Sequence, residues 1–246
     1  MFKEYLVLSS RDPRRNLECQ DYVINRHARA VLRHHAFQGV FRRYIISRTV
    51  QPGTASMQHT LYAQRTEVPM IVEHVCDDAA LFRKALQNED HKAAIKPDEE
   101  YIASEFLSGP PMAIEMDERL VLSQPHVSRY RVFDFLVRRP EVDRSEFVTW
   151  LDREAELLAD SNEFRSIASR RVHNVAGSGA ALYAESGGTG ASTGQGYGAI
   201  VETWVDSLQD FSTVLPSMMH RYDNYVDSAA SYSVVTTEHV LVTDQS

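Results

Sequence analysis

Apolar positions along the chain follow two different spacings. Runs rich in β-branched and aromatic residues predict strands, and apolar positions three and four residues apart predict helices. Strands are expected in the first half at 3–9, 40–50, 68–76 and 113–122, and in the second at 128–137, 169–176, 197–205 and 232–243. Helical spacing covers 17–35, 78–103, 144–167 and 208–227, and Pro216 predicts a kink or a break in the last of these. Each half therefore has the order strand, helix, strand, strand, helix, strand.

Similar segments recur in the two halves. FRRYI at 41–45 matches SRRVH at 169–173, an offset of 128 residues. The segment that begins with Ile71-Val72-Glu73 matches the one that begins with Ile200-Val201-Glu202, with five identities in twelve positions. A repeat of this length indicates a duplicated structural unit. We expect two homologous domains, residues 1–124 and 125–246, joined by a short linker next to Pro125.

A β-α-β-β-α-β unit is typical of the ferredoxin-like fold, an antiparallel sheet with helices on one face. Several strands carry bulky apolar residues on both faces, as in Leu6, Val7 and Leu8, so the second face of each sheet must also be covered. We therefore expect an α+β fold in which two tandem ferredoxin-like units turn their sheets toward each other and enclose a barrel. The interior of that barrel is the expected ligand pocket.

Composition and charge limit the partners. Acidic residues outnumber basic ones, 34 against 26, and the net charge of -8 gives no support for binding to nucleic acid or to an anionic membrane. The expected partner is a small-molecule substrate. Cys19 and Cys76 are too few for a disulfide framework and favour a reducing, cytoplasmic environment. Most glycines fall between residues 177 and 198, which we interpret as a flexible hairpin loop.

Several segments resemble the EthD family of the dimeric α+β barrel superfamily. They are CQDYVINRHARAV from Cys19, FRRYII, PMIVEHVCDDAALFRKAL, PDEEYIASE and ERLVL. The resemblance implies a cytoplasmic protein whose two units form an intrachain barrel around a central pocket. Relatives in that superfamily include cofactor-free monooxygenases, isomerases, cyclases, dehydratases and haem-binding enzymes. His27 matches the family pattern, whereas the second half has Ala155 at the corresponding position, so histidine chemistry is expected in the first half.

Four residues are candidates for acid-base catalysis. His27 could be a general base at the pocket mouth, or a histidine that is bonded to a strand carbonyl. Glu73 lies in an otherwise apolar strand, where burial without a partner would raise the pKa of its carboxyl group. His173 and Asp134 are further polar residues in apolar strands, and a structural salt bridge is the alternative for Asp134.

A second set of polar and aromatic residues is expected to contact substrate or to line the pocket. Glu202 is equivalent to Glu73 by the repeat, and Arg43 and Arg171 could instead neutralise these two carboxylates. Because strand residues alternate between faces, only one of Glu73 and His74 can point into the barrel. The expected substrate-binding residues are Tyr44, Arg43, His74, Arg171, Glu202, Trp204 and Tyr232.

The favoured function is a cofactor-independent enzyme of lyase, dehydratase or isomerase type that acts on a small apolar or aromatic substrate. The alternatives are a non-catalytic binding protein of a degradation pathway and a cofactor-free monooxygenase. No cofactor and no metal site are expected, since HExxH and CxxC motifs are absent from the sequence. A tandem chain supplies both halves of the barrel, so dimerisation is not needed for closure, although a homodimer is possible.

Overall fold

Eight long antiparallel strands form a single sheet that closes on itself into a barrel. The structure is a computed structural model that describes residues 1–50, 59–177, 192–193 and 196–243. Around the barrel the strands follow the order β1-β3-β2-β9-β5-β8-β6-β4, and β4 pairs back with β1. The two-residue strand β7 lies parallel to the start of β4. The expected hairpin loop in the glycine-rich stretch 177–198 lies largely outside the described residues.

Strand positions agree closely with the apolar pattern. The strands are β1 Phe2–Val7, β2 Phe41–Thr49, β3 Met70–Cys76, β4 Met112–Ser123, β5 Tyr130–Val137, β6 Ala168–Ala176, β7 Ser192–Thr193, β8 Tyr197–Val205 and β9 Tyr232–Val242. The helices are α1 Asn16–Tyr22, α2 Ala28–Arg33, α3 Ala79–Gln87, α4 Glu89–Ala94, α5 Lys96–Glu105, α6 Arg144–Asp160, α7 Asn162–Ile167 and α9 Leu208–Tyr222.

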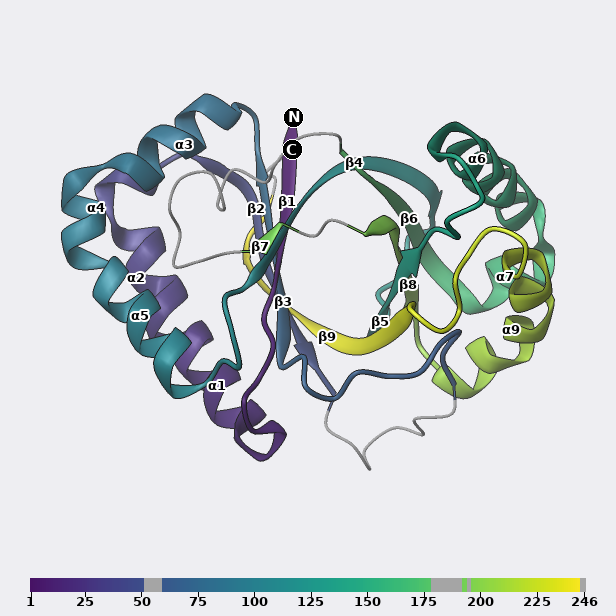
Figure 1. Ribbon diagram of the computed structural model, residues 1–246, viewed down its shortest axis with the longest axis horizontal. Helices are drawn as coiled ribbons and strands as arrows, with labels where there is room; N and C mark the ends of the chain where they lie inside the picture. The colour runs from purple at the N-terminus through teal and green to yellow at the C-terminus, as the bar shows by residue number, and fades with distance from the viewer. Residues whose placement is uncertain (51–58, 178–191, 194–195, 244–246) are drawn as a thin grey trace.

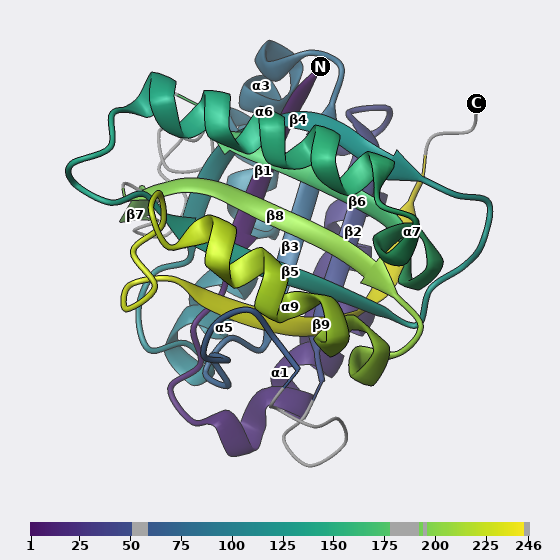
Figure 2. The same ribbon diagram turned by 90° about the vertical axis from the view of Figure 1, so that its right-hand side faces the viewer.

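The helices form two groups on opposite sides of the barrel. Helices α1 to α5 cover the strands of the first half, and α6, α7 and α9 cover those of the second half (Figures 1 and 2). Short polar side chains start several of these helices: Asp78, Asp143 and Ser207 each accept a hydrogen bond from a first-turn amide. Within the described residues, no helix is long and apolar enough to cross a membrane.

Three of the expected helical segments are divided: 17–35 into α1, a π-helical turn and α2, 78–103 into α3, α4 and α5, and 144–167 into α6 and α7. The segment 78–103 is divided into three helices, because Asn88 ends α3 and caps α4, and Pro97 lies in the first turn of α5. Of the kink or break expected at Pro216, the break is wrong, since α9 continues from Leu208 to Tyr222 with Pro216 inside it, and the kink stays a prediction.

The expected fold class, two tandem ferredoxin-like sheets that face each other, is also wrong. The hydrogen bonding is continuous around one closed barrel, so there are not two separate sheets with a space between them. β2 pairs with β9 from Tyr44 to Thr49, and β4 pairs with β6 from Met116 to Ser123. An open sheet would leave these strands as edges with unpaired backbone groups, and closure of the barrel removes those edges.

One end of the barrel interior is filled by apolar and aromatic side chains. Phe135 stacks on Tyr232 with ring centroids 4.5 Å apart, and Tyr5 meets Phe133 edge to face. These side chains come from strands of both halves and form one buried cluster: Tyr5, Val7, Val68, Ile71, Ile114, Met116, Phe133, Phe135, Ile200, Tyr232 and Val234. This end of the barrel is therefore part of the core.

The other end of the interior holds a cluster of charged side chains, which we call the barrel ion cluster: Lys3, Arg43, Glu73, Glu118, Arg131, Glu202 and Glu238. Arg131 lies at its centre and binds Glu73, Glu202 and Glu238. Lys3 lies 2.6 Å from Glu118 and 3.2 Å from Glu202. Tyr5 donates a hydrogen bond to Glu202.

Three cations hold the four carboxylates of this cluster. Burial raises the pKa of Glu73, but Lys3, Arg131 and Arg43 outweigh burial and hold that pKa below its ordinary value. Arg131 is 1% exposed, so removal of its guanidinium would leave Glu73 and Glu202 buried beside too little positive charge. Breaking a buried ion pair from one side costs about 3–5 kcal/mol.

We therefore expect Arg131→Met to lower the free energy of unfolding by about 3–5 kcal/mol, measured by urea denaturation at pH 7. Arg119→Met is the matched control, because Arg119 pairs with Asp152 on the surface and is 41% exposed. The control should change stability by less than about 1 kcal/mol. Equal stability of the two variants would show that the barrel ion cluster does not stabilise the fold.

Candidate functional site

The residues expected to share one lumen pocket are divided among three places. Glu73, Arg43, Glu202, Trp204 and Tyr232 belong to the barrel interior. His27, Tyr44 and His74 line a pocket between the barrel and the helices of the first half. Asp134, Arg171 and His173 lie between the barrel and the helices of the second half, where they contact Ser233, Thr203 and Tyr222.

The barrel interior does contain a cavity, of about 370 Å³, at the end occupied by the barrel ion cluster. Its walls include Arg43, Glu118 and Trp204, and Trp204 lies against the guanidinium groups of Arg131 and Arg170. Neighbouring cations hold the pKa values of Glu73, Glu118 and Glu202 below their ordinary values, so these carboxylates are ionised and already paired. A carboxylate in that state is a poor proton acceptor at neutral pH, so Glu73 and Glu202 are better suited to structure than to catalysis.

In the second half, the space between barrel and helices is filled by an apolar core that contains a buried polar network. Arg171 is fully buried and donates to His173, Thr203 and Tyr222 at 3.0, 2.7 and 2.8 Å. Burial lowers the pKa of His173 well below its ordinary value, so this imidazole is neutral. These contacts explain both residues as packing elements of the second half.

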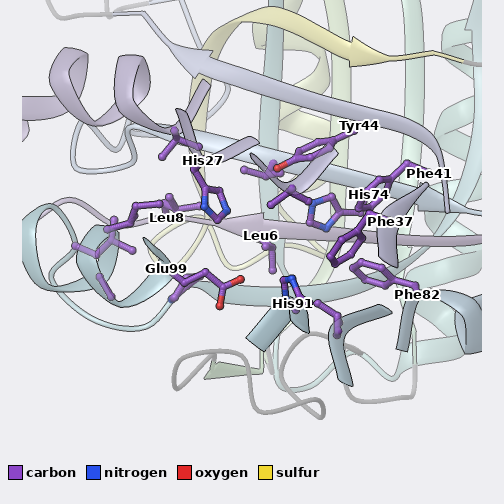
Figure 3. Close-up of a pocket in the computed structure, with 18 residues that line it drawn as sticks. Leu6, Leu8, His27, Phe37, Phe41, Tyr44, His74, Phe82, His91 and Glu99 are labelled. Carbon is purple, nitrogen blue, oxygen red and sulfur yellow. The ribbon is translucent and has the colours of Figure 1, made fainter. Parts of the chain in front are cut away.

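The first-half pocket lies between the outer face of β1, β2 and β3 and the helices above them (Figure 3). It is small, about 70 Å³, and mostly apolar. Its side chains of interest are three imidazoles, one phenol and one carboxylate among aliphatic and aromatic neighbours. The lining residues are Leu6, Leu8, Val23, His27, Val31, Phe37, Phe41, Tyr44, Val72, His74, Phe82, Leu86, His91, Glu99, Ile102, Ala103, Leu107 and Pro111.

His27 reaches this pocket from a local irregularity in its helix. Between α1 and α2 the chain makes a π-helical turn, Val23–His27, in which the amide of Ala28 bonds to the carbonyl of Val23. Such turns contain one residue more than an α-helical turn and are often found at functional sites. Val23, Ile24 and Ala28 are buried, whereas His27 is partly exposed at the pocket.

Asp98 in the first turn of α5 holds the His27 ring in place. The Nδ1 atom of His27 lies 2.7 Å from Oδ2 of Asp98, and the hydroxyl of Tyr22 donates to the other carboxylate oxygen. The bond to His27 is the main influence that keeps the pKa of Asp98 below its ordinary value. Burial and the bond to Asp98 raise the pKa of Tyr22 to about 12, so Tyr22 remains a donor.

This arrangement determines which nitrogen of His27 is available. Because Asp98 is ionised and only accepts hydrogen bonds, Nδ1 of His27 carries the proton that it donates to Asp98. In this tautomer Nε2 is the acceptor, it has no hydrogen-bond partner among the described residues, and the ring lies at the pocket (Figure 3). A histidine oriented by a carboxylate in this way has the geometry of a general base.

The other polar side chains of the pocket have different environments. Burial lowers the pKa of His91 to about 4, so its ring is neutral, and its Nδ1 has no hydrogen-bond partner among the described residues. His74 is packed among Phe41, Tyr44 and Phe82, with ring centroids 4.9 to 5.4 Å apart. Burial raises the pKa of Tyr44 above its ordinary value, and the carboxylate of Glu99 raises it further. Tyr44 is therefore a neutral hydrogen-bonding group.

Among the described residues, no three His, Cys, Asp or Glu side chains are placed to hold a metal ion. His27 is already engaged by Asp98, and His74 lies 3.8 Å from Glu4, so each of these imidazoles faces a carboxylate of its own. The donor set of the pocket therefore fits an organic ligand better than a metal.

Sequence reasoning missed several residues of both sites. Asp98 and Glu99 lie in the PDEEYIASE segment that carries the family resemblance, but nothing in their spacing pairs Asp98 with His27. Lys3 lies two residues before Tyr5, and Arg131 lies two residues before Phe133. Each of these cations therefore shares a strand face with an aromatic residue. That spacing could have indicated a charged cluster on the same face as an apolar core.

The protein is thus a closed antiparallel barrel with helices on its outside, and its pocket lies beneath the helices of the first half. Residues 16–105 match the model of the EthD domain family. This segment includes most of the pocket lining, from Val23 to Ala103. No curated protein matches the sequence.

Solved structures with similar folds are distant in sequence. An anthrone oxidase-like protein aligns with a TM-score of 0.61 and 11% identity over 97% of this chain and 92% of its own. Proteins from Lactobacillus acidophilus and Fusobacterium nucleatum, each named a "putative monooxygenase", align with TM-scores of 0.53 and 0.54 and identities of 7% and 8%. The first alignment covers 99% of this chain and 96% of the other, and the second 97% and 93%. The neighbours are dimeric α+β barrel proteins, which the single closed barrel of this chain matches loosely.

Asp134 allows a test of the second-half network. Its carboxylate is fully buried; one oxygen accepts from Ser233 at 2.6 Å, and the other has no hydrogen-bond partner among the described residues. Burial raises the pKa of Asp134 to about 6. Since this folded-state pKa lies above the unfolded value, stability falls as pH rises from about 4 through 6 and stays lower above that window.

We expect Asp134→Asn to gain stability relative to wild type between pH 4 and pH 7.5, by up to about 3 kcal/mol, because the amide cannot ionise. Urea denaturation at several pH values measures the difference. Asp152→Asn, at an exposed ion pair, is the control and should show no such rise. A stability difference that does not depend on pH would mean that Asp134 ionises normally in the folded protein.

Proposed function

We propose that the chain is an enzyme that removes a proton from a small aromatic or apolar substrate in the first-half pocket, with His27 as the general base. The observation that carries this proposal is the bond between Nδ1 of His27 and Asp98, which leaves Nε2 as an acceptor at the pocket. Tyr22 and Asp98 act as positioning residues, since they hold the ring and do not line the cavity.

The remaining lining explains what kind of substrate would fit. Phe37, Phe41 and Phe82 provide flat apolar walls, and Tyr44, His74 and His91 are polar groups that can bond to oxygen atoms of a ligand. Burial of a neutral imidazole such as His91 without a partner is costly unless a ligand supplies one. A phenol or a ketone with an acidic C–H group offers both an apolar body for the aromatic walls and an oxygen atom for the polar groups.

Proton removal of this kind begins several reactions. In a dehydratase, isomerase or lyase, the carbanion expels a group or is protonated elsewhere. In a cofactor-independent monooxygenase, the carbanion passes electrons to O₂. The folds shared with an anthrone oxidase-like protein and with the Lactobacillus acidophilus protein favour the oxygenase as the second candidate. The first half is the expected location in either case, because the second half has Ala155 where the first has His27.

The test uses 4-hydroxyphenylacetone, a one-ring ketone, in D₂O, with exchange of its benzylic protons followed by NMR. Wild-type protein should accelerate exchange, and His27→Ala should lose about 10²-fold or more of that acceleration. Asp98→Asn should also slow exchange, because the amide can donate a hydrogen bond to Nδ1 and so favours the wrong tautomer. His35→Ala is the matched control, since His35 is 60% exposed and lies outside the pocket.

Oxygen uptake, recorded in the same samples, distinguishes the two candidates. Exchange without uptake supports an isomerase or dehydratase, and uptake that depends on His27 supports an oxygenase. Binding of the ketone without either signal would favour a non-catalytic binding protein. Exchange in His27→Ala at the wild-type rate would remove His27 as the base.

A further inference from the structure

The first-half pocket continues into a groove on the protein surface. The two hollows share Ala103 and Leu107 as walls, and Pro110 of the groove is next to Pro111 of the pocket. The groove is about 450 Å³ and much more open than the pocket, and its other side chains include Arg11, Glu100, Ser104 and Ser108. A molecule bound in the pocket could therefore extend past Leu107 into the groove.

The size of the pocket favours such an extension. An engineered cavity that takes up benzene measures about 150 Å³, roughly twice the 70 Å³ of this pocket. A pocket of half that size does not enclose a whole aromatic ring with substituents, so part of such a ligand has to extend beyond the pocket. Its remaining atoms would lie in the groove, which is the neighbouring hollow.

Arg11 is the cation of this groove. Its backbone is fixed, since its amide bonds to the carbonyl of Phe106 at 2.8 Å and Ser10 pairs with Leu107. Within the described part of the chain, its guanidinium has no ion pair and no hydrogen bond, whereas nearby Arg14 pairs with Asp12 and Arg15 with Glu18. Arg11 thus has its full set of donors available at the outer end of the pocket.

The groove also contains one carboxylate, Glu100, which forms no ion pair with Arg11. Its negative charge opposes an anionic ligand, as does the net charge of -8 of the whole chain. Any preference for an anion at this position therefore has to come from direct contact with the guanidinium, which binds a carboxylate through two parallel hydrogen bonds.

We propose that the ligand of the pocket is an aromatic carboxylate, whose ring enters the pocket beneath the helices and whose acidic end is bound by Arg11 in the groove. This inference rests on the proposed function, because it assumes that the pocket is the substrate site. It makes Arg11 a specificity-determining residue rather than a catalytic one.

The experiment compares three probes that have the same phenol ring and three-carbon chain: 3-(4-hydroxyphenyl)propanoate, its neutral amide and the corresponding propylamine. Affinities are measured by calorimetry at low and at physiological ionic strength. Wild-type protein should bind the propanoate on the order of tenfold more tightly than the amide. Arg11→Gln should abolish that preference and leave the affinity for the amide unchanged, and Glu100→Gln should strengthen binding of the propanoate.

Arg14→Gln is the matched control, because Arg14 is exposed, close in sequence and already paired with Asp12. It should keep the wild-type preference. Equal affinities for propanoate and amide in wild type, or tighter binding of the propylamine through Glu100, would overturn the inference about the acidic end while the pocket still binds the ring. Failure of all three probes to bind would overturn both this inference and the proposed substrate site.

Discussion

The ion pairs of Arg131 link the two halves of the closed barrel across its interior. The guanidinium of Arg131 joins Glu73 of the first half to Glu202 of the second, so the two halves share one buried ion pair network across the interior. A cation surrounded by carboxylates accepts little displacement, because breaking any one of these ion pairs leaves a buried charge without its partner. Together with the strand pairs β2–β9 and β4–β6, this network holds the two halves in one register.

This constraint also separates structure from chemistry. The strand faces that point inward supply the aromatic core and the barrel ion cluster, and those that point outward in the first half supply Tyr44 and His74. A rigid barrel allows the helices of the first half to carry His27 and Asp98 above a fixed floor. In the second half the corresponding space is taken by Arg171 and its partners.

The strands and most helices could be predicted from apolar spacing, because each spacing reflects one local backbone geometry. Alternation also predicted that Glu73 and His74 point to opposite faces, and the structure places Glu73 inside and His74 outside. The spacing of apolar residues could not show whether the pocket lies in the first or the second half. That depends on which side chains lie between the barrel and the helices, such as Arg171 in the second half. Closure into one sheet was missed because hydrogen bonds between β2 and β9 join residues almost 200 positions apart. That the two halves are homologous domains stays a prediction.

The π-helical turn before α2 has a geometric consequence for the pocket. Each residue added to a helix rotates everything after it by about 100° relative to what came before. Val23 and Ile24 at the start of this turn and Ala28 and Val31 after it are all buried in the same core, so the helix keeps its contact with the barrel through the irregularity. His27 is the last residue of the turn, and from there its ring reaches Asp98 in α5. One helical segment thus both covers the core and positions a reactive side chain.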